Sequence, residues 1–537
     1  MTNSPVPGRM SRHPDGGAGA TGSSNVARMG RGGSLNLVGA LCYQGSLFVI
    51  LSLLARLSEV DVGRYTTCYA LLALLSLLSL AGFRAGMTRF VAMHLADEDP
   101  SRVRGTIRMG LGLTLAASLV VSAALTLVAP WVATLLRDDT LSDGIRLIAL
   151  TLPAATFTDA ALAATQGWRT QRAFTLVGRV FEPLSRLGLT AGALALGLGI
   201  TGALWSLVIA AWVTAVIAAL VLWRRLRSVP RAGAVYEVRQ IFSFSMVSWV
   251  SALAATGLIW ADILLLGALA GQEEVGTYSV ASRLVMLAIF VMAPINAAFT
   301  PHMAHLYHTG QIDEASRAYG SASRWILMLS APAFILLLAF PAQLLSYFGG
   351  SFAEAATVTV VLALGQLISA AAGPCGTVLN MSGRVGLNMA DNLAVLVGNV
   401  LLNFLLIPEM GVIGAAIAWS ASLITVNVVK VLQAYYVVGI AASGVNLGTT
   451  ALAAIPAALV AAVVSRQTDT WVGAVLVGAP AVLGVFVITL FARGLGVDDR
   501  ALLASLIDHR HRSLTPHLRK RPKGPGLTKR RKTRHSP

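Results

Sequence analysis

Long apolar stretches alternate with short polar segments along most of this chain. A helix needs about 20 mainly apolar residues to cross a bilayer, and stretches of that kind recur from residue 35 to residue 492. They fall at 35–55, 65–83, 107–130, 145–165, 184–200, 201–223, 244–270, 277–300, 325–347, 356–379, 391–407, 411–436, 447–465 and 472–492. The fifth and sixth stretches are nearly continuous and are broken only by the glycine-rich residues 197–202, so the pattern predicts an all-α, polytopic membrane protein with 12–14 transmembrane helices.

Composition supports a membrane environment. The 537 residues are 55% hydrophobic and only 12% charged, with a mean hydropathy of +0.71. A soluble domain carries roughly 25% charged residues, so an ordinary soluble protein is excluded. Cys42, Cys68 and Cys375 lie far apart in separate apolar stretches, and no CxxC spacing occurs. We therefore expect no disulfide framework, no metal site and no cofactor.

The net charge of +17 is concentrated toward the two ends of the chain. Residues 1–34 and 496–537 are polar and basic, and His509–Pro537 holds eleven Lys or Arg but no Asp or Glu. We expect both ends to be disordered tails. Beside a bilayer their favoured partner is the anionic cytoplasmic leaflet, to which each basic residue adds about 1 kcal/mol, rather than nucleic acid. The first apolar stretch begins only near Leu35 and is expected to be a retained span, not a cleaved signal peptide.

Basic residues are unevenly shared between alternate loops. The loops after even-numbered stretches hold sixteen: Arg84, Arg89, Arg102, Arg104, Arg169, Arg172, Arg179, Arg186, Arg224, Arg225, Arg227, Arg231, Arg239, Arg317, Arg324 and Arg384. The loops after odd-numbered stretches hold four: Arg56, Arg64, Arg137 and Arg466. Because cytoplasmic loops carry an excess of Lys and Arg, we expect the even loops and both termini to be cytoplasmic, in a multi-pass protein of the cell membrane.

Two short motifs recur at almost the same offset. Val-Gly-Arg-Tyr at 62–65 returns as Val-Gly-Thr-Tyr at 275–278, and Gly-Ile-Thr-Gly-Ala at 199–203 returns as Gly-Val-Ile-Gly-Ala at 411–415. Because six spans separate the copies, the repeats are parallel and predict two pseudo-symmetric six-helix bundles that suit alternating access. The expected division is an N-lobe at 35–223, a cytoplasmic linker at 224–243, a C-lobe at 244–436 and two additional helices at 437–495.

The six-plus-six arrangement resembles the multidrug/oligosaccharidyl-lipid/polysaccharide (MOP) exporter superfamily. Residues 260–267 (WADILLLG) and 273–281 (EEVGTYSVA) look like that superfamily's junction between the seventh and eighth spans, and residues 410–418 (MGVIGAAIA) are similar to its entry into the twelfth. The resemblance covers residues 35–465. It implies a V-shaped bundle with a central cavity, through which a polar head group passes while a polyprenyl tail stays in the lipid.

Among the branches of this superfamily, the chain most resembles the polysaccharide (Wzx-type) flippases. The resemblance implies a flippase that exports a polyprenyl-diphosphate-linked glycan for cell-surface polysaccharide biosynthesis, with glycan-assembly enzymes as further partners. A lipid II flippase, which also has fourteen spans, remains an alternative. So does a cation-coupled multidrug antiporter, although those usually carry an acidic residue in the first span and residues 35–55 contain none.

Ionisable side chains inside apolar stretches need a reason, since each costs about 2.5–3.5 kcal/mol at mid-bilayer. Asp262 and Arg283 lie at similar predicted depths on consecutive spans, because a helix rises 1.5 Å per residue. We expect them to form a pair, with Arg283 also holding a diphosphate by charge-assisted hydrogen bonds. The positions 213 residues earlier are Val49 and Ala70, so the pair belongs to one repeat only. A buried ion pair that fixes helix register is the alternative.

Three further charged residues complete the candidate cavity. Asp159 lies in the fourth span, where it would take up a proton or cation or, more simply, cap a local hydrogen-bond network. Lys430 lies near the cytoplasmic end of the twelfth span, where extension to the interface is favoured over a cavity role. Arg56 follows the first span on the expected external side. Arg179, Glu182 and Arg186 have helical spacing, for which pairing along the helix is the ordinary explanation.

A membrane-embedded enzyme, such as a polysaccharide polymerase or ligase, is the rival class. Such enzymes need converging acids, bases or nucleophiles, often on a large external loop, but every expected external loop here is short. The sequence contains no GxSxG, HExxH or P-loop motif. We therefore predict a transporter, without catalytic residues, whose energy source and exact glycan the sequence leaves open.

Overall fold

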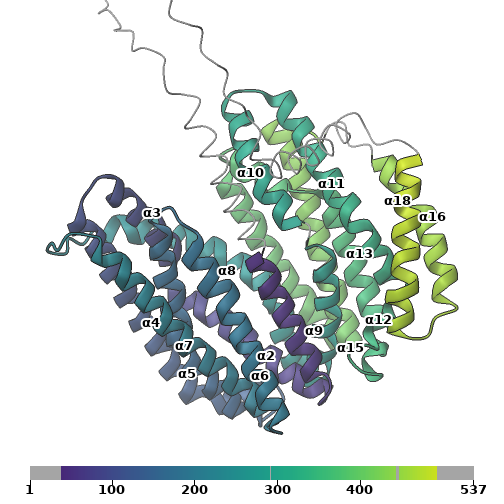
Figure 1. Cartoon of the computed structure of the whole chain (residues 1–537), viewed down its shortest axis with the longest axis horizontal. Coiled ribbons are helices and arrows are strands. Elements are labelled where there is room, and N and C mark those ends of the chain that lie inside the picture. Colours follow the sequence, from purple (N-terminus) through teal and green to yellow (C-terminus); the bar gives the residue numbers. More distant parts are fainter. Residues whose placement is uncertain (1–37, 291, 443–446, 493–537) are drawn as a thin grey trace, which may run out of the picture.

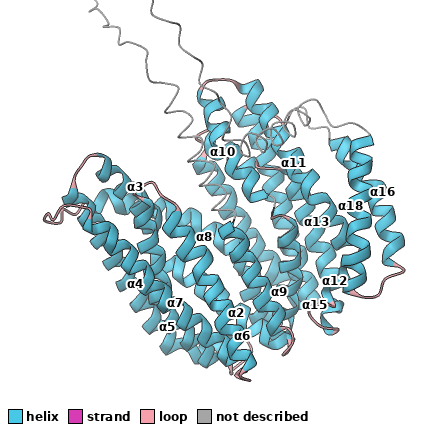
Figure 2. Ribbon diagram, viewed as in Figure 1, coloured by secondary structure: helices cyan, strands magenta, loops and turns pink. Residues whose placement is uncertain are grey.

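The computed structural model describes residues 38–290, 292–442 and 447–492, and these residues form helices and short connections with no β-strand among them (Figure 2). The predicted all-α, polytopic fold is confirmed. The expected basic tails, 1–34 and 496–537, lie outside the described residues.

The helices before residue 228 make up the first bundle, with Val38–Leu54 at its boundary with the second, where the Phe48 ring stacks on that of Tyr347 (Figure 1). They are Val38–Leu54, α2 (Glu59–Leu80), α3 (Phe83–Ala96), α4 (Pro100–Leu135), α5 (Leu141–Gln166), the π-helix η1 (Phe174–Phe181), α6 (Glu182–Ala195) and α7 (Gly199–Arg227).

The helices from residue 238 to residue 438 make up the second bundle. They are α8 (Val238–Leu269), α9 (Gln272–Ala288), α10 (Met292–His308), α11 (Ile312–Ala339), α12 (Pro341–Leu345), the 3-10 helix η2 (Ser351–Ala355), α13 (Ala356–Ala372), α14 (Cys375–Met381), α15 (Val385–Gln433) and the π-helix η3 (Ala434–Val438). A last group packs on α11 at the outer edge: α16 (Leu447–Ser465), α17 (Trp471–Gly473), the π-helix η4 (Ala474–Gly478) and α18 (Ala479–Ala492).

Over the part of the chain that the structure describes, each predicted apolar stretch overlaps at least one helix, although fewer helices meet a strict length and apolarity test. Within the described residues ten helices do so, or eleven if the bent pair α9–α10 is one span. Three features explain the difference. Val38–Leu54 is shorter than the rest, the fifth span (η1 with α6) carries charged side chains, and α15 contains both predicted stretches 391–407 and 411–436, with Gly411 between them.

The repeated glycine motif marks the same backbone feature in both bundles. Gly199, where α7 begins, has φ +54°, and Gly411, inside α15, has φ +55°. This left-handed conformation favours glycine because it has no Cβ. Each glycine allows one helix to end and the next to begin in a new direction after very few residues. The matched φ values give the two-motif repeat a structural basis.

The other repeated motif brings the two bundles together, where α2 crosses α9. A Cβ on Gly63 would overlap the carbonyl oxygen of Gln272, and a Cβ on Gly276 would overlap that of Glu59. Side chains add Thr67 Oγ1 donating to Gln272 Oε1 at 2.8 Å and Thr277 Oγ1 donating to Glu59 Oε2 at 3.0 Å. We call this region the closed end, because the bundles converge here and diverge toward α3 and α10, the open end (Figure 1).

The helix α8 packs on both bundles and connects them. Trp249 Nε1 donates to the carbonyl oxygen of Leu77 in α2 at 3.0 Å, while Asp262, further along α8, is bonded to Asn403 of α15. The preceding residues are fixed to the first bundle, since Arg104 donates to the carbonyl oxygens of Val229 and Pro230. The helix α8 is therefore anchored to both bundles.

Candidate functional site

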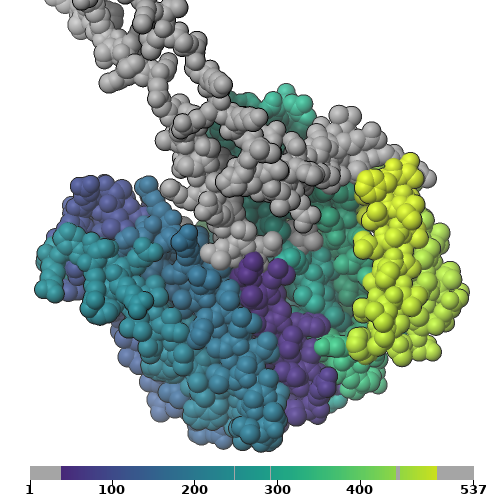
Figure 3. Space-filling view, viewed as in Figure 1, coloured from purple at the N-terminus to yellow at the C-terminus, as the bar shows by residue number. Residues whose placement is uncertain are grey.

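A cavity of about 830 Å³ lies between the two bundles. Helix Val38–Leu54, α2, α3, α5, η1, α6 and α7 line one side, and α8, α9 and α10 line the other. In the space-filling view the bundles meet below this region, at the closed end (Figure 3). The volume is that of a site for a ligand of several hundred daltons.

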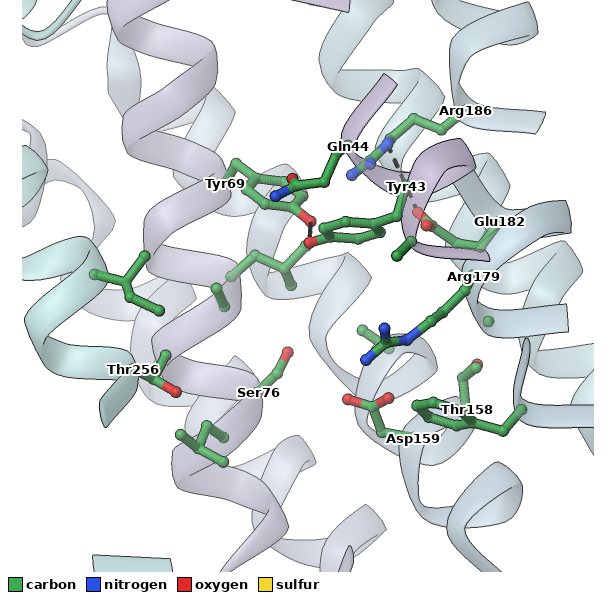
Figure 4. Close-up of a pocket in the computed structure, with 18 of the residues that line it drawn as sticks. Tyr43, Gln44, Tyr69, Ser76, Thr158, Asp159, Arg179, Glu182, Arg186 and Thr256 are labelled. Carbon is green, nitrogen blue, oxygen red and sulfur yellow. Dashed lines mark hydrogen bonds and ion pairs between the residues drawn. The ribbon is translucent and has the colours of Figure 1, made fainter. Parts of the chain in front are cut away.

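Five charged side chains from the first bundle line the cavity. Arg84, Arg179 and Arg186 supply three positive charges, and Asp159 and Glu182 supply two negative charges. The Arg179 guanidinium points toward Asp159, across from η1 to α5 (Figure 4). Arg84 and Arg179 also lie against the ring of Phe174, at 5.1 and 5.3 Å from its centroid. Short π-helical segments often occur at functional sites. Here the π-helix η1 carries Phe174 and Arg179, which line the cavity.

A second group of polar side chains lies nearer the closed end, and we call it the polar layer. It consists of Tyr43, Gln44, Tyr69, Arg186 and Arg283. Tyr43 and Tyr69 share a hydrogen bond of 2.6 Å between their hydroxyl groups, and Arg186 lies over the Tyr69 ring at 4.9 Å (Figure 4). Arg186 is only 1% exposed, and its Nε is 3.7 Å from Glu182 Oε1, which is too long for a hydrogen bond. Arg283 Nη1 donates to Gln44 Oε1 at 3.2 Å. These side chains join the helix Val38–Leu54, α2, α6 and α9 around one point.

Arg186 and Arg283 retain unused hydrogen-bonding capacity. Arg186 Nε and Nη2 and Arg283 Nε are buried without a hydrogen-bond partner among the described residues. The two guanidiniums are close enough to repel each other, and Glu182 is the only carboxylate that pairs with either of them in this part of the structure. Buried donors of this kind normally have partners. The layer is therefore suited to a bound anion that accepts several N–H groups at once.

The predicted Asp262–Arg283 pair does not form. Asp262 is 1% exposed and accepts from Asn403 Nδ2 at 2.6 Å and from Tyr278 at 3.2 Å. Arg283 instead reaches Gln44 of the first bundle. The rise per residue of a helix predicts a similar depth for Asp262 and Arg283. It does not predict how each helix is rotated about its axis. Asp262 faces α15 and links it to α8, whereas Arg283 faces Gln44 of the first bundle.

Of the remaining predicted site residues, one lies in the cavity and two lie outside it. Asp159 lines the cavity. Arg56 is exposed in the turn after Val38–Leu54 and is not among the residues that line the cavity. Lys430 is only 8% exposed and donates to Asn392 Oδ1 at 2.6 Å inside the second bundle. The expected extension of Lys430 to the interface is wrong, because its side chain is buried and its ammonium group bonds to Asn392 instead.

Sequence reasoning missed most of the lining. The uneven distribution of basic residues predicts a cytoplasmic loop for Arg179 and Arg186, but η1 and α6 carry them inside a helical span. Their spacing with Glu182, which does produce an i,i+4 pair, was the available signal. Tyr43, Gln44 and Tyr69 give no such signal, since aromatic and amide side chains are common at helix contacts. No group of His, Cys, Asp and Glu suited to a metal occurs in the described part of the chain.

Two family models match the sequence. The family described as polysaccharide biosynthesis protein matches residues 29–307, and MatE matches residues 248–405. The chain is 25% identical over 201 residues to the probable low-salt glycan biosynthesis flippase Agl15 of Haloferax volcanii, covering 37% of this chain and 42% of that protein. It is 26% identical over 186 residues to the probable flippase AglR of the same organism, covering 33% and 38%. The matches thus span about two fifths of these relatives.

Solved structures share the fold. An inward-facing multidrug resistance MATE family transporter of the MOP superfamily aligns with a TM-score of 0.60 at 16% identity, covering 75% of this chain and 98% of the other. The lipid II flippase MurJ in an inward closed conformation aligns with a TM-score of 0.60 at 11% identity, covering 82% and 97%. At these identities the likeness concerns the fold alone.

Proposed function

Because this chain belongs to the polysaccharide biosynthesis protein family, we propose that it is a flippase for a polyprenyl-diphosphate-linked oligosaccharide. The family membership also confirms the predicted MOP superfamily. In the proposed cycle the glycan and its diphosphate cross the membrane within the cavity, while the polyprenyl chain stays in the lipid.

The observation that carries this proposal is the layer formed by Arg186 and Arg283. A diphosphate diester carries two negative charges and many acceptor oxygens, which match buried guanidinium N–H groups without other partners. The cavity side chains Arg84, Arg179, Arg186, Asp159 and Glu182 add to one net positive charge, and neighbouring Arg283 makes two. One diphosphate would therefore neutralise this part of the molecule.

The arrangement of the bundles fits one stage of alternating access. The α2–α9 crossing closes one end, and the bundles diverge at the other. If the termini are cytoplasmic, as the distribution of arginine favours, the open end faces the cytoplasm and receives the newly made lipid-linked glycan. Release on the far side then requires α2 and α9 to separate. This cycle uses binding and movement, so we propose no catalytic residue.

The decisive test is deletion of the gene followed by mass spectrometry of the lipid-linked intermediates that accumulate. A polyprenyl-diphosphate oligosaccharide should accumulate on the cytoplasmic side, and wild-type protein should restore export. Accumulation of the peptidoglycan precursor lipid II instead would replace the proposed substrate with that lipid. If neither accumulates and export continues unchanged, the flippase proposal is wrong.

A further inference from the structure

The part of the cavity nearest the open end holds charged side chains that form no ion pair. We call Arg84, Asp159, Phe174 and Arg179 the outer group; they lie on α3, α5 and η1. Arg179 points toward Asp159, but the ion pairs formed by the described residues include no member of this group (Figure 4). Arg186 is buried, whereas Arg179 is exposed and Arg84 and Asp159 are half-buried. The outer group therefore presents solvated charges to the cavity.

Phe174 holds the two arginines of the outer group near each other. The guanidinium carbons of Arg84 and Arg179 lie 5.1 and 5.3 Å from the centroid of its ring. The two cations are close enough to repel each other. Attraction to the electron-rich face of the ring offsets part of this repulsion. An anion that accepts N–H groups from both arginines would relieve the rest.

The outer group and the polar layer are too far apart for one diphosphate to contact both. Arg179 and Arg186 lie seven positions apart on the continuous helix formed by η1 and α6. At about 1.5 Å per residue this is roughly 10 Å, which is longer than a diphosphate group. Their guanidiniums also have different directions, since Arg179 points toward Asp159 and Arg186 lies over the Tyr69 ring (Figure 4). A diphosphate therefore occupies one position or the other.

The two positions carry the same formal charge. The two arginines and one aspartate of the outer group give one net positive charge, and Arg186 and Arg283 with Glu182 give the same. Without Asp159 the outer group would carry two positive charges and would compete more strongly for a dianion. A transport path needs binding that is favourable enough for entry and weak enough for departure. The carboxylate of Asp159 serves the second requirement.

The outer group belongs wholly to the first bundle. The described residues of α8, α9 and α10 that line the cavity, among them Ile259, Met286 and Met292, carry no charge. An anion that enters between the bundles therefore meets its first positive charges on the wall formed by α3, α5 and η1. From there η1 and α6 lead to Arg186, whose buried, unpaired N–H groups bind an anion more strongly because less water surrounds them.

We propose that the outer group is an entry site, where the diphosphate of the incoming substrate binds before it reaches the polar layer, and that Asp159 keeps this binding weak. This inference deepens the proposed flippase function and rests on it. The diphosphate first bridges Arg84 and Arg179, and then passes along η1 and α6 to Arg186 and Arg283. Asp159 repels the dianion and so favours its departure toward the deeper position.

Removal of the deeper position should reveal the entry site. In lipid nanodiscs, the full-length Arg186→Gln/Arg283→Gln variant should still bind a short isoprenoid diphosphate, more weakly than wild type. The additional change Arg179→Gln should abolish this residual binding. With a photoreactive diazirine beside the diphosphate, cross-linked peptides should shift from α6 and α9 in wild type to α3 and η1 in the double variant. Loss of all binding in the double variant, or cross-links elsewhere, would overturn the proposal.

Asp159→Asn should change binding in the opposite direction, which damage to the fold would not do. We expect it to bind the isoprenoid diphosphate about 5-fold more tightly, the effect in water of one unit charge about 4 Å away. Asp143→Asn, at the exposed start of the same helix, is the control and should match wild type. Equal or weaker binding by Asp159→Asn would contradict the role given to its carboxylate.

The same assay separates this inference from the proposed function. If wild-type protein binds no isoprenoid diphosphate, the proposed diphosphate-linked substrate is wrong, and the entry site with it. If wild-type protein binds the probe but the variants do not behave as expected, only the entry site is rejected.

Discussion

At the scale of single residues, the unused N–H groups of Arg186 and Arg283 are the most informative feature of the cavity. Neither guanidinium is neutralised by a carboxylate within hydrogen-bonding distance. The sequence identified Arg283 from its place in an apolar stretch. It did not identify Arg186, because its i,i+4 partner Glu182 made an ordinary helix-surface pair the simpler interpretation.

Replacing either arginine should weaken anion binding. Hydrogen bonds to charged groups contribute about 1.5–3 kcal/mol, and 1.4 kcal/mol corresponds to a factor of ten. We expect Arg283→Gln and Arg186→Gln each to weaken binding of a short isoprenoid diphosphate by about 10- to 100-fold, measured by titration calorimetry. Arg146→Gln is the control, because Arg146 is exposed on α5 and pairs only with Asp143. Equal affinities in all variants would rule out the proposed anion site.

A second residue-scale prediction concerns pH and the Arg64–Asp138 pair at the closed end. Arg64 Nε donates to Asp138 Oδ2 at 2.6 Å, and Asp138 lies in the loop between α4 and α5. Partial burial raises the pKa of Asp138, but hydrogen bonds from Arg64 and Thr140 outweigh it and hold the pKa below its usual value. A lowered carboxyl pKa stabilises the fold above the unfolded pKa of about 3.9, and this stabilisation disappears as pH falls through the folded pKa.

Asp138→Asn should therefore lower the thermal unfolding temperature at pH 6, and its difference from wild type should shrink once the pH falls below about 4. Differential scanning fluorimetry across this pH range provides the measurement. Asp143→Asn is the matched control, since the Asp143 side chain is 88% exposed. A pH-independent difference for Asp138→Asn would show that lost packing, rather than lost charge, causes the effect.

At the scale of elements, the α2–α9 crossing depends on glycine in both helices. The Val-Gly-x-Tyr motif could be found in the sequence as a repeat, but its purpose could not. A repeat at the start of two helices does not show that those helices touch each other. In the folded protein each glycine faces a carbonyl oxygen of the partner helix, so the repeat creates a symmetric contact between bundles.

Gly63→Ala should push α2 and α9 apart. A Cβ at this position would overlap the carbonyl oxygen of Gln272, and overpacking typically costs about 1–3 kcal/mol. A cost of that size moves a two-state equilibrium by about 5–150-fold, here toward an opened closed end. Spin-label distances across α2 and α9 should lengthen. Gly112→Ala in α4 is the control, because no atom lies near its added methyl group; identical distance distributions in both variants would contradict the prediction.

At the scale of the whole molecule, transport should require the closed end to open. Glu59 and Thr277 belong to different bundles and contact each other there. In protein with Cys42, Cys68 and Cys375 replaced by Ser, a disulfide between Glu59→Cys and Thr277→Cys should abolish translocation, and reduction should restore it. Binding of the diphosphate from the open end should survive oxidation.

A control pair separates bridging of the bundles from oxidation itself. Asp143→Cys with Arg146→Cys lies within α5, so oxidation there leaves the bundles free to move. Translocation should continue in this control. Transport by the oxidised Glu59–Thr277 variant at the wild-type rate would show that the closed end does not need to open.

The sequence by itself determined the membrane environment, the helical spans and the internal repeat. Each is set by local properties: the length of an apolar stretch against the thickness of a bilayer, and glycine where the backbone takes a positive φ, as at Gly199 and Gly411. These requirements act on a few neighbouring residues and are therefore visible along the chain.

Only the tertiary structure decided which side chains meet. Asp262 bonds to Asn403 rather than to Arg283, and Arg283 bonds to Gln44, 239 residues away in the chain. Such partners depend on the rotation of each helix about its axis and on the packing of distant helices. A rotation of one residue position turns a side chain by about 100°, which separates a cavity residue from one that faces its own bundle.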